Sequence, residues 1–359
     1  MNMKKNVIAL GIAGALSIPA AASAVQIAGE DLEVYVKAHV SLDFSDPDNP
    51  AVDSQTSISS NSSRIGFKGK RQLENGMTAL FQIESKVVFD ESGSELATRN
   101  TFVGLQNGFG TVLVGYADTP FKDLGGDFTL FGDTVADRRA ILGSGVGSSN
   151  AINDRATNMI MYKNMLGPTE VKILYSTSTP NDDVPSSPGI DNNDNALFSG
   201  SAVYKDGPLA IGLAIESQDN ATNASPAEKV DGTRLGVMYD FGNFGLGAIY
   251  ESLSSDDIAA LDRDAYGING TLKLSGNTKL QAQILMADEN ATTETGATMT
   301  SFGVSKKLDK KTEVYAIYTS TSNDDAANFQ GVEDGHGDEL KTVAGGSPNA
   351  FSLGFVHSI

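Results

Sequence analysis

Isolated basic residues and a group of carboxylates are the side chains in this sequence best suited to an electrostatic role. Lys37 and Arg64 each stand among alternating apolar and polar residues, whereas Arg99 and Arg155 bracket residues 117–154. That stretch has no hydrophobic period and carries several aspartates, and structureless stretches of this length are usually functional or disordered. Basic and acidic side chains that face each other across a narrow, water-filled gap would orient dipoles and sort ions without breaking any bond.

Residues suited to covalent catalysis do not form a recognisable set. The three histidines, His39, His336 and His357, each lack an evident partner nearby in the sequence, and the sequence contains no G-x-S-x-G segment. A serine nucleophile needs a base within hydrogen-bond reach. The glycine-rich stretch 143–147 lacks the strand, helix and lysine of a phosphate-binding loop. The sequence therefore predicts neither an enzyme nor a cofactor site.

Two acidic segments could attract cations. Residues 191–195 resemble part of a calcium-binding loop but lack its later glycine and bidentate glutamate, and residues 333–339 are simply acidic. Solvated loops that attract cations diffusely, for example at lipopolysaccharide bridges, are the favoured interpretation. We predict no specific metal site, and calcium binding by these loops is left open.

Alternation of apolar and polar residues places the basic side chains on strands. In residues 32–44 the even positions, such as Val36 and Val40, are apolar, while Lys37 lies on the opposite face. Arg64 likewise lies opposite Ile65 and Phe67. A charge on a lipid-facing surface near the bilayer midplane costs about 2–4 kcal/mol, so these side chains are expected to face water. Arg99 is less clear by this criterion, because Val103 and Leu105 share its face.

The same pattern repeats along the chain with short and long connections in turn. A soluble sandwich would show the same period, but it has no reason to keep short turns at one end and long polar segments at the other. Outer-membrane barrels are built in that way, and closure removes their exposed strand edges. We therefore predict an all-β fold, a 16-stranded antiparallel transmembrane β-barrel, with strands at 32–44, 64–71, 77–89, 97–105, 111–116, 158–163, 170–176, 197–205, 209–217, 231–240, 244–251, 265–274, 279–287, 298–308, 311–320 and 349–359.

The N-terminal residues carry an export signal rather than part of this fold. Lys4 and Lys5 precede the apolar residues 7–18, and Ala22-Ser23-Ala24 suits cleavage, which predicts a signal peptide over residues 1–24 and a barrel over residues 25–359. The whole chain has a net charge of −19, which becomes −21 without Lys4 and Lys5. Such an acidic chain offers no basic patch for nucleic acid. Cysteine is absent, which excludes disulfides and thiol chemistry.

Several motifs resemble those of the general porins of Gram-negative bacteria. They are Ser63-Arg64-Ile65-Gly66-Phe67-Lys68-Gly69, Arg99-Asn100-Thr101-Phe102-Val103-Gly104-Leu105, Asp123-Leu124-Gly125-Gly126-Asp127 and Arg155-Ala156-Thr157-Asn158. The resemblance implies a homotrimer of sixteen-stranded barrels, each with its third external loop folded inward to narrow the pore. It also implies a charged constriction, with the wall residues Lys37, Arg64, Arg99 and Arg155 facing the loop residues Asp123 and Asp127.

The chain departs from the family pattern at two positions. Tyr116 stands where family members often have arginine, and Ile359 replaces the usual terminal phenylalanine. The resemblance implies a passive diffusion channel for ions and small hydrophilic solutes in the outer membrane, in contact with lipid and lipopolysaccharide. A substrate-specific channel and a barrel with adhesive, partner-binding loops are the alternatives. The basic residues that frame 117–154 favour a channel, because an adhesin has no need to fill its own lumen.

Overall fold

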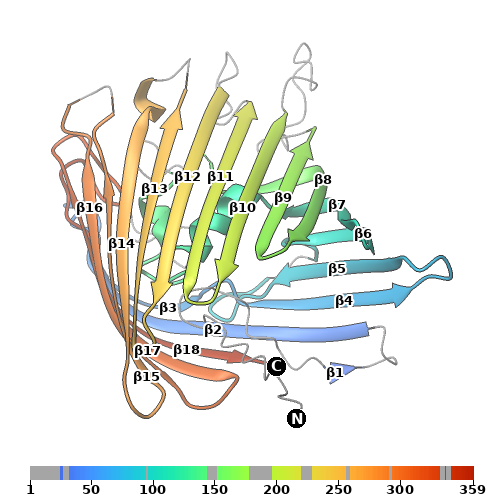
Figure 1. Ribbon diagram of the computed structural model, residues 1–359. Coiled ribbons are helices and arrows are strands. Elements are labelled where there is room, and N and C mark those ends of the chain that lie inside the picture. The colour runs from blue at the N-terminus through green and yellow to red at the C-terminus, as the bar shows by residue number, and fades with distance from the viewer. Residues whose placement is uncertain are drawn as a thin grey trace, which may run out of the picture.

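A computed structural model of the chain describes residues 25–26, 32–93, 96–143, 152–177, 196–219, 229–255, 259–290, 293–331, 336 and 341–359. Neighbouring strands pair antiparallel in one continuous sheet that closes on itself (Figure 1). The strands are β1 (Val25–Gln26), β2 (Leu32–Asp46), β3 (Gln55–Ser60), β4 (Arg64–Gln72), β5 (Thr78–Lys86), β6 (Thr101–Asn107), β7 (Gly110–Asp118), β8 (Arg155–Leu166), β9 (Thr169–Ser176), β10 (Leu197–Asp206), β11 (Leu209–Asp219), β12 (Lys229–Asp240), β13 (Phe244–Ser254), β14 (Arg263–Lys273), β15 (Thr278–Ala287), β16 (Ala297–Lys307), β17 (Thr312–Asn323) and β18 (Asn349–Ser358).

The predicted barrel of sixteen strands is confirmed. Eighteen strands share the sheet, but β1 is a two-residue addition, and β3 and β4 together form one barrel strand, because both pair with β2. Closure is made between β18 and β2, for example where Phe355 lies opposite Val40. Every barrel strand therefore has two partners, which satisfies the backbone without an open edge.

The two faces of the strands differ in chemistry, as the alternation predicts. On β11, Ile211, Leu213 and Ile215 are exposed, whereas Ala214 and Glu216, which point to the opposite face, are buried. We call the second face, which carries the buried polar and small residues of each strand, the polar face. The apolar face is the one that lipid can cover at no cost in unpaired polar groups.

Short turns join the strands at one end of the barrel, and several need residues that tolerate positive φ. Gly76, Gly207, Gly242 and Asn277 all have φ between +56° and +94°. These residues lie in the turns β4–β5, β10–β11, β12–β13 and β14–β15, so the chain can reverse within a few residues. We call this end of the barrel the short-turn end.

Two sequence predictions about strands need correction. The predicted strands omit residues 45–63, but Gln55–Ser60 forms β3 and pairs with β2. Its polar composition hides the strand, because hydroxyl and amide residues face both sides. Residues 97–105 were expected to be a strand throughout, but β6 begins only at Thr101.

Arg99 therefore lies in an irregular segment just before β6. Ala97 has a φ of 60°, and the hydroxyls of Thr98 and Thr101 accept hydrogen bonds from the backbone N–H groups of Lys86 and Glu84. These side chains replace the ladder hydrogen bonds that a regular strand would make. The backbone N–H of Arg99 still donates to the Glu84 carbonyl at 3.0 Å, so the segment stays attached to β5.

Between β7 and β8 the chain forms two short helices, α1 (Pro120–Asp127) and the 3₁₀ helix η1 (Arg138–Ala140), shown in green in Figure 1. Thr119 caps α1 by accepting from the Lys122 N–H, and Pro120 occupies the first helical position, where it costs no hydrogen bond. We call residues 119–143 the β7–β8 segment. Its helix contacts β9, β10, β11 and β12.

Glycines on the polar face make room for the β7–β8 segment. Gly212 and Gly236 lie opposite each other on β11 and β12, and a Cβ at either would come within 2.5 Å of the Phe128 ring. Phe121, Leu124 and Phe128 are buried and belong to the largest apolar cluster of the described residues. Side chains this closely packed hold the segment against the wall. No helix in the described ranges is long and apolar enough to cross a membrane.

Candidate functional site

Asp133 of the β7–β8 segment lies at the centre of a group of cations. Its Oδ2 is 3.1 Å from Lys37 Nζ on β2 and 3.9 Å from Arg64 Nη2 on β4, and its Oδ1 is 3.6 Å from Arg139 Nη2. Lys37 and Arg64 are opposite residues in the register of β2 and β4. One carboxylate thus faces two wall cations and one cation of its own segment.

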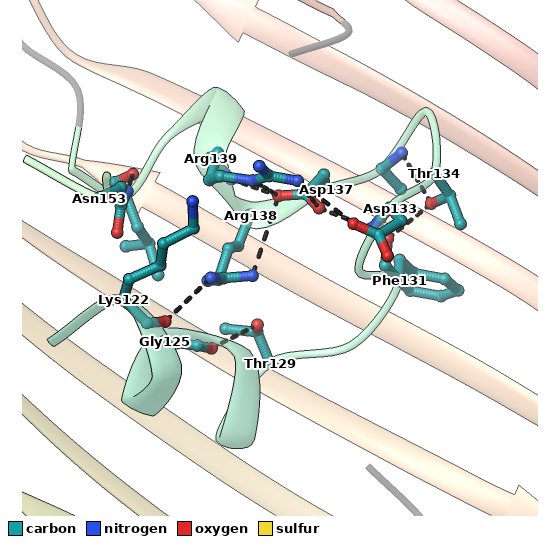
Figure 2. A network of polar contacts seen from close by, with 12 residues as sticks. Lys122, Gly125, Thr129, Phe131, Asp133, Thr134, Asp137, Arg138, Arg139 and Asn153 are labelled. Carbon is teal, nitrogen blue, oxygen red and sulfur yellow. Dashed lines mark hydrogen bonds and ion pairs between the residues drawn. The ribbon is translucent and has the colours of Figure 1, made fainter. Parts of the chain in front are cut away.

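Local hydrogen bonds hold Asp133 in this position. The backbone N–H of Asp133 donates to Asp137 Oδ2 at 2.7 Å, and the Thr134 hydroxyl donates to the Phe131 carbonyl at 2.7 Å (Figure 2). Phe131 and Asp133 have φ of 62° and 58°, a conformation that costs non-glycine residues about 1–2 kcal/mol. The hydrogen bonds and the surrounding packing must offset that cost, which makes the position of Asp133 a fixed one.

Asp137 makes hydrogen bonds both to Asp133 and to η1. It caps η1 by accepting from the Arg139 N–H at 2.9 Å, and it also receives Arg139 Nε and Nη2, each at 2.9 Å. A bidentate pair of this kind orients the guanidinium as well as neutralising it. Arg139 is therefore aimed at Asp133, while Arg138 donates from Nη2 to the Lys122 carbonyl of α1 (Figure 2).

The electrostatics of the two acids keep them ionised. Burial would raise the pKa of Asp133, but Lys37, Arg64 and Arg139 outweigh burial and hold that pKa well below its ordinary value. For Asp137, burial likewise acts to raise the pKa, and Arg139 reverses the effect, so the pKa is lowered. Both carboxylates remain charged at any pH near neutrality.

Arg99 pairs with the barrel wall rather than with the β7–β8 segment. Its Nε lies 2.7 Å from Glu84 Oε1, and the Tyr35 hydroxyl donates to Glu84 Oε2 at 2.8 Å. The Tyr35 ring covers Gly66, where a Cβ would be 2.1 Å from the ring. Glu84 therefore neutralises Arg99 locally, and the two side chains are fixed on β5 and its neighbours.

Arg155 pairs with Asp118 at the point where the β7–β8 segment leaves the wall. Arg155 Nε is 3.2 Å from Asp118 Oδ1, and the two residues are opposite each other at the ends of β7 and β8. Lys122 Nζ on α1 is also 3.2 Å from Asp118 Oδ1, and Asn100 Nδ2 donates to Asp118 Oδ2 at 2.9 Å. This cluster ties α1 to the ends of both strands.

Asp123 and Asp127 do not meet the four wall residues with which the sequence grouped them. Asp123 Oδ2 is 2.9 Å from Lys172 Nζ on β9, and Asp127 Oδ2 is 3.5 Å from Lys205 Nζ on β10. The structure therefore places the six predicted residues in several separate pairs. Lys37 and Arg64 come together, and their acidic partner is Asp133.

A fully buried ion pair fastens the β7–β8 segment to the wall. Arg234 of β12 donates from Nε to Glu251 of β13 at 2.9 Å, and neither side chain has any exposed surface. Arg234 Nη1 also donates to the Phe121 carbonyl at 2.8 Å, and its Nη2 donates to Asn153 Oδ1 at 3.1 Å. Glu251 Oε1 accepts from the Gly143 N–H at 2.6 Å. We call this arrangement the Arg234 anchor, and it holds the segment both in α1 and after η1.

Sequence reasoning missed the partners that the fold supplies. Lys172, Lys205 and Glu251 lie on strands where charged residues on the polar face are common, so nothing in the local sequence singles them out. Arg234 did carry a signal, because Gly232 and Gly236 flank it on one face, opposite exposed Leu235 and Val237. An arginine between two glycines on the polar face indicates a side chain that is covered by another segment.

Several predictions fall on residues outside the described part of the chain. They are the signal peptide over residues 1–24, the acidic segment 191–195 and most of 333–339. His336 is described, and its Nε2 lies 2.8 Å from Asp43 Oδ2, with both side chains buried. Within the described ranges, no three His, Cys, Asp or Glu side chains are arranged to hold a metal ion.

Comparison with known proteins places this arrangement in context. A family model described as Gram-negative porin matches residues 12–326. The "Major outer membrane protein P.IB" of Neisseria meningitidis is 34% identical over 123 residues, which is 34% of this chain and 36% of that relative, so the alignment spans about a third of its length.

Solved structures extend the likeness to most of the chain. The "Anion-selective porin from Comamonas acidovorans" has a TM-score of 0.76 at 22% identity, over 91% of this chain and 99% of that one. The outer membrane protein OmpT of Vibrio cholerae in its trimer form has a TM-score of 0.66 at 20% identity, over 91% and 99% of the two chains. At these identities the structural likeness shows the fold.

Proposed function

The chain belongs to the Gram-negative porin family, and we propose that it is a passive diffusion channel for ions and small hydrophilic solutes across the outer membrane. The closed sixteen-stranded barrel supplies the wall, with an apolar face for lipid and a polar face for water. The curated relative with the 34% match is an outer membrane protein, which supports the same location.

The β7–β8 segment is the inward-folded third external loop that narrows the channel. Its packing against the polar face supports this role, because that face is the one opposite the exposed apolar residues. The Arg234 anchor and the glycine positions under Phe128 support it as well, since a segment that sets pore width must not move freely. Pore width then sets the size limit for solutes.

The single observation that carries the charged constriction is the position of Asp133 opposite Lys37 and Arg64. Arg99 and Arg155 on the wall and Asp123 and Asp127 on α1 add further charges, each within its own pair, with Glu84, Asp118, Lys172 and Lys205. The field between opposite charges orients dipolar solutes and makes it costly for apolar ones to displace ordered water. Each charge has a partner, so no single group binds a passing solute tightly enough to retain it.

The balance of charges gives the channel a salt-dependent ion preference. The whole chain is acidic, so external segments enrich cations at low salt, when charges act over long distances. Around Asp133 the cations Lys37, Arg64, Arg138 and Arg139 outnumber the acids Asp133 and Asp137. At high salt only these nearby charges act, and cation preference weakens or reverses.

The assembled form is a homotrimer in contact with outer-membrane lipid and lipopolysaccharide. OmpT of Vibrio cholerae, which shares the fold, is known in a trimer form, and exposed aliphatic side chains run along the strands of this chain. A substrate-specific channel is the alternative within the same family.

Single-channel recording tests the proposal directly. Purified protein in a planar bilayer should give discrete conductance steps in potassium chloride, and a salt gradient should give a reversal potential whose sign reports ion preference. We expect cation preference at about 10 mM salt, where the Debye length is about 30 Å, and a smaller or opposite preference at 1 M, where it is about 3 Å. A protein that inserts but passes no current would contradict the channel, and an identical reversal potential at both salts would contradict the balance of near and distant charges.

A further inference from the structure

A cavity beside the constriction is lined by far more cations than acids. It has a volume of about 310 Å³ and lies between the β7–β8 segment and the short-turn end of β15 to β17. Its basic side chains are Lys37, Arg138, Lys279, Lys307, Lys310 and Lys311, against the two carboxylates Asp309 and Glu313. Lys37 is paired with Asp133 and Arg138 with Asp137, so the remaining four lysines exceed the two lining carboxylates by two positive charges. This local excess stands out in a chain whose net charge is −19.

Strand register shows why the lysines gather in one place. Lys279 lies opposite Ser305, which puts it diagonal to Lys307 on the same face of the adjacent strand. Diagonal neighbours of this kind are roughly 7–8 Å apart. Lys310 and Lys311 follow in the β16–β17 turn, where Asp309 accepts a hydrogen bond from the Lys311 N–H at 2.7 Å. Across the described residues, none of these four lysines has a carboxylate within ion-pair distance.

We propose that this cavity, the basic vestibule, binds small oxyanions of two or more negative charges, of the phosphate or pyrophosphate kind, and draws them into the channel from the short-turn end. Adjacent ammonium groups repel one another, and a multivalent anion between them relieves that repulsion, whereas chloride relieves less of it. The hydroxyls of Ser305, Thr312 and Ser358 also line the cavity and can donate to anion oxygens. The inference rests on the proposed channel function, since it names a class of solute for it.

The neighbouring lysine shows that the gathering is specific to the polar face. Lys306 precedes Lys307, and it lines a different groove, together with Leu42, Leu353 and Phe355 on the exposed apolar face. The lysines near the short-turn end could also bind the phosphate of a lipid headgroup. Because Lys307 and Lys279 line the cavity beneath Arg138 rather than that outer groove, a soluble oxyanion is the better fit.

The test uses the full-length protein and pyrophosphate as the probe. We expect pyrophosphate added on one side of a planar bilayer to reduce the potassium chloride current, and the same addition on the other side to do less. The fourfold variant Lys279→Gln, Lys307→Gln, Lys310→Gln, Lys311→Gln should need about tenfold more pyrophosphate for half block, because four favourable charges are removed. Lys306→Gln is the matched control, and pyrophosphate should block its current at the same concentration as in the unaltered protein.

Titration calorimetry of the protein in a neutral detergent provides a readout that does not depend on conduction. Heat of pyrophosphate binding should be lost in the fourfold variant and kept in Lys306→Gln. The proposed anion site would be wrong if pyrophosphate blocked the current equally from both sides, or if the fourfold variant were blocked as easily as the unaltered protein. Neither result would contradict the proposed channel function. Absence of any current would instead count against the proposed function. If block vanished when phosphatidylglycerol was added to the bilayer, the lysines would be lipid ligands and the inference would be wrong.

Discussion

Removal of the Arg234 guanidinium should release the β7–β8 segment while leaving the barrel closed. Arg234→Met preserves much of the side-chain volume but deletes the donors to Glu251, to the Phe121 carbonyl and to Asn153 Oδ1. Glu251 would keep the hydrogen bond from the Gly143 N–H but lose the guanidinium that it contacts directly. No strand-pairing hydrogen bond depends on the Arg234 side chain, so the loss falls on docking of the segment.

The size of the effect follows from the burial of both charges. Removing one member of a fully buried pair leaves the other uncompensated and costs about 3–5 kcal/mol. Every 1.4 kcal/mol is about a tenfold change in an equilibrium. The ratio of docked to undocked segment should therefore fall by about a hundredfold or more. An undocked segment widens the channel and moves within it.

Three measurements follow that change. Single channels of Arg234→Met should show a larger mean conductance with slow current fluctuations, the β7–β8 segment should become sensitive to limited proteolysis, and the Gly143 amide should exchange faster. The double variant Arg234→Met, Glu251→Gln should recover much of the loss, because a neutral pair leaves no buried charge and Gln can still accept from Gly143.

A control on the same strand separates docking from general damage. Lys229 pairs with Asp231 at 3.3 Å, but both side chains are about half exposed, so Lys229→Met should cost at most about 1 kcal/mol and leave the current quiet. If Arg234→Met showed unchanged conductance without added fluctuations and kept its protease resistance, the Arg234 anchor would not hold the segment in place. Fluctuations of equal size in Lys229→Met would also contradict this role of the anchor.

Three further expectations concern the constriction and its packing. Asp133→Asn should shift the reversal potential in a potassium chloride gradient towards anion preference, because Lys37, Arg64 and Arg139 lose a shared counterion. This shift should be larger than that of the double variant Asp123→Asn, Asp127→Asn. An equal or smaller shift would show that the acids of α1 determine the ion preference. Because the pKa of Asp133 and of Asp137 lies below its ordinary value, the stabilisation from both is complete above the ordinary value near 3.8 and is lost only as pH falls through the lower folded values. The difference in reversal potential between the unaltered protein and Asp133→Asn should thus stay constant from neutral pH to about pH 5, and a clear change in that difference would contradict the charge assigned to Asp133. Gly236→Ala would place a Cβ 2.2 Å from Phe128 and should destabilise docking by about 1–3 kcal/mol, measured by proteolysis, whereas Gly200→Ala on β10 meets nothing closer than 3.7 Å and should be silent.

The sequence predicts the barrel well because the relevant pattern is local. Alternation within residues 32–44 is enough to identify β2 and to assign the side of Lys37, with no knowledge of its neighbours. The same method misses β3, since Ile58 is the one apolar residue in Gln55–Ser60 and gives no alternation. It also extends the strand before β6, because hydroxyls of Thr98 and Thr101 take over backbone hydrogen bonds in a way that composition does not reveal.

The partners within the site could not be predicted, because each is set by distant parts of the chain. Lys37 and Asp133 are 96 residues apart, and their contact depends on how the β7–β8 segment lies across the barrel. Asp133 was visible in the sequence as one aspartate among several in residues 117–154. Its position is fixed by the positive φ of Phe131 and by the Asp137 side chain, which neither hydropathy nor charge count reports.

The pairing of β2 with β18 has a consequence for biogenesis. β2 is the first long strand to leave the ribosome, yet its partner residues 349–358 are made more than three hundred residues later. Until then β2 has an unsatisfied edge, which would accept a strand from any other chain. Closure between such distant segments is also slow compared with hairpin formation. The seam between β2 and β18 can therefore form only after all other strands have been synthesised, and the edge of β2 stays open to pairing with another copy until then.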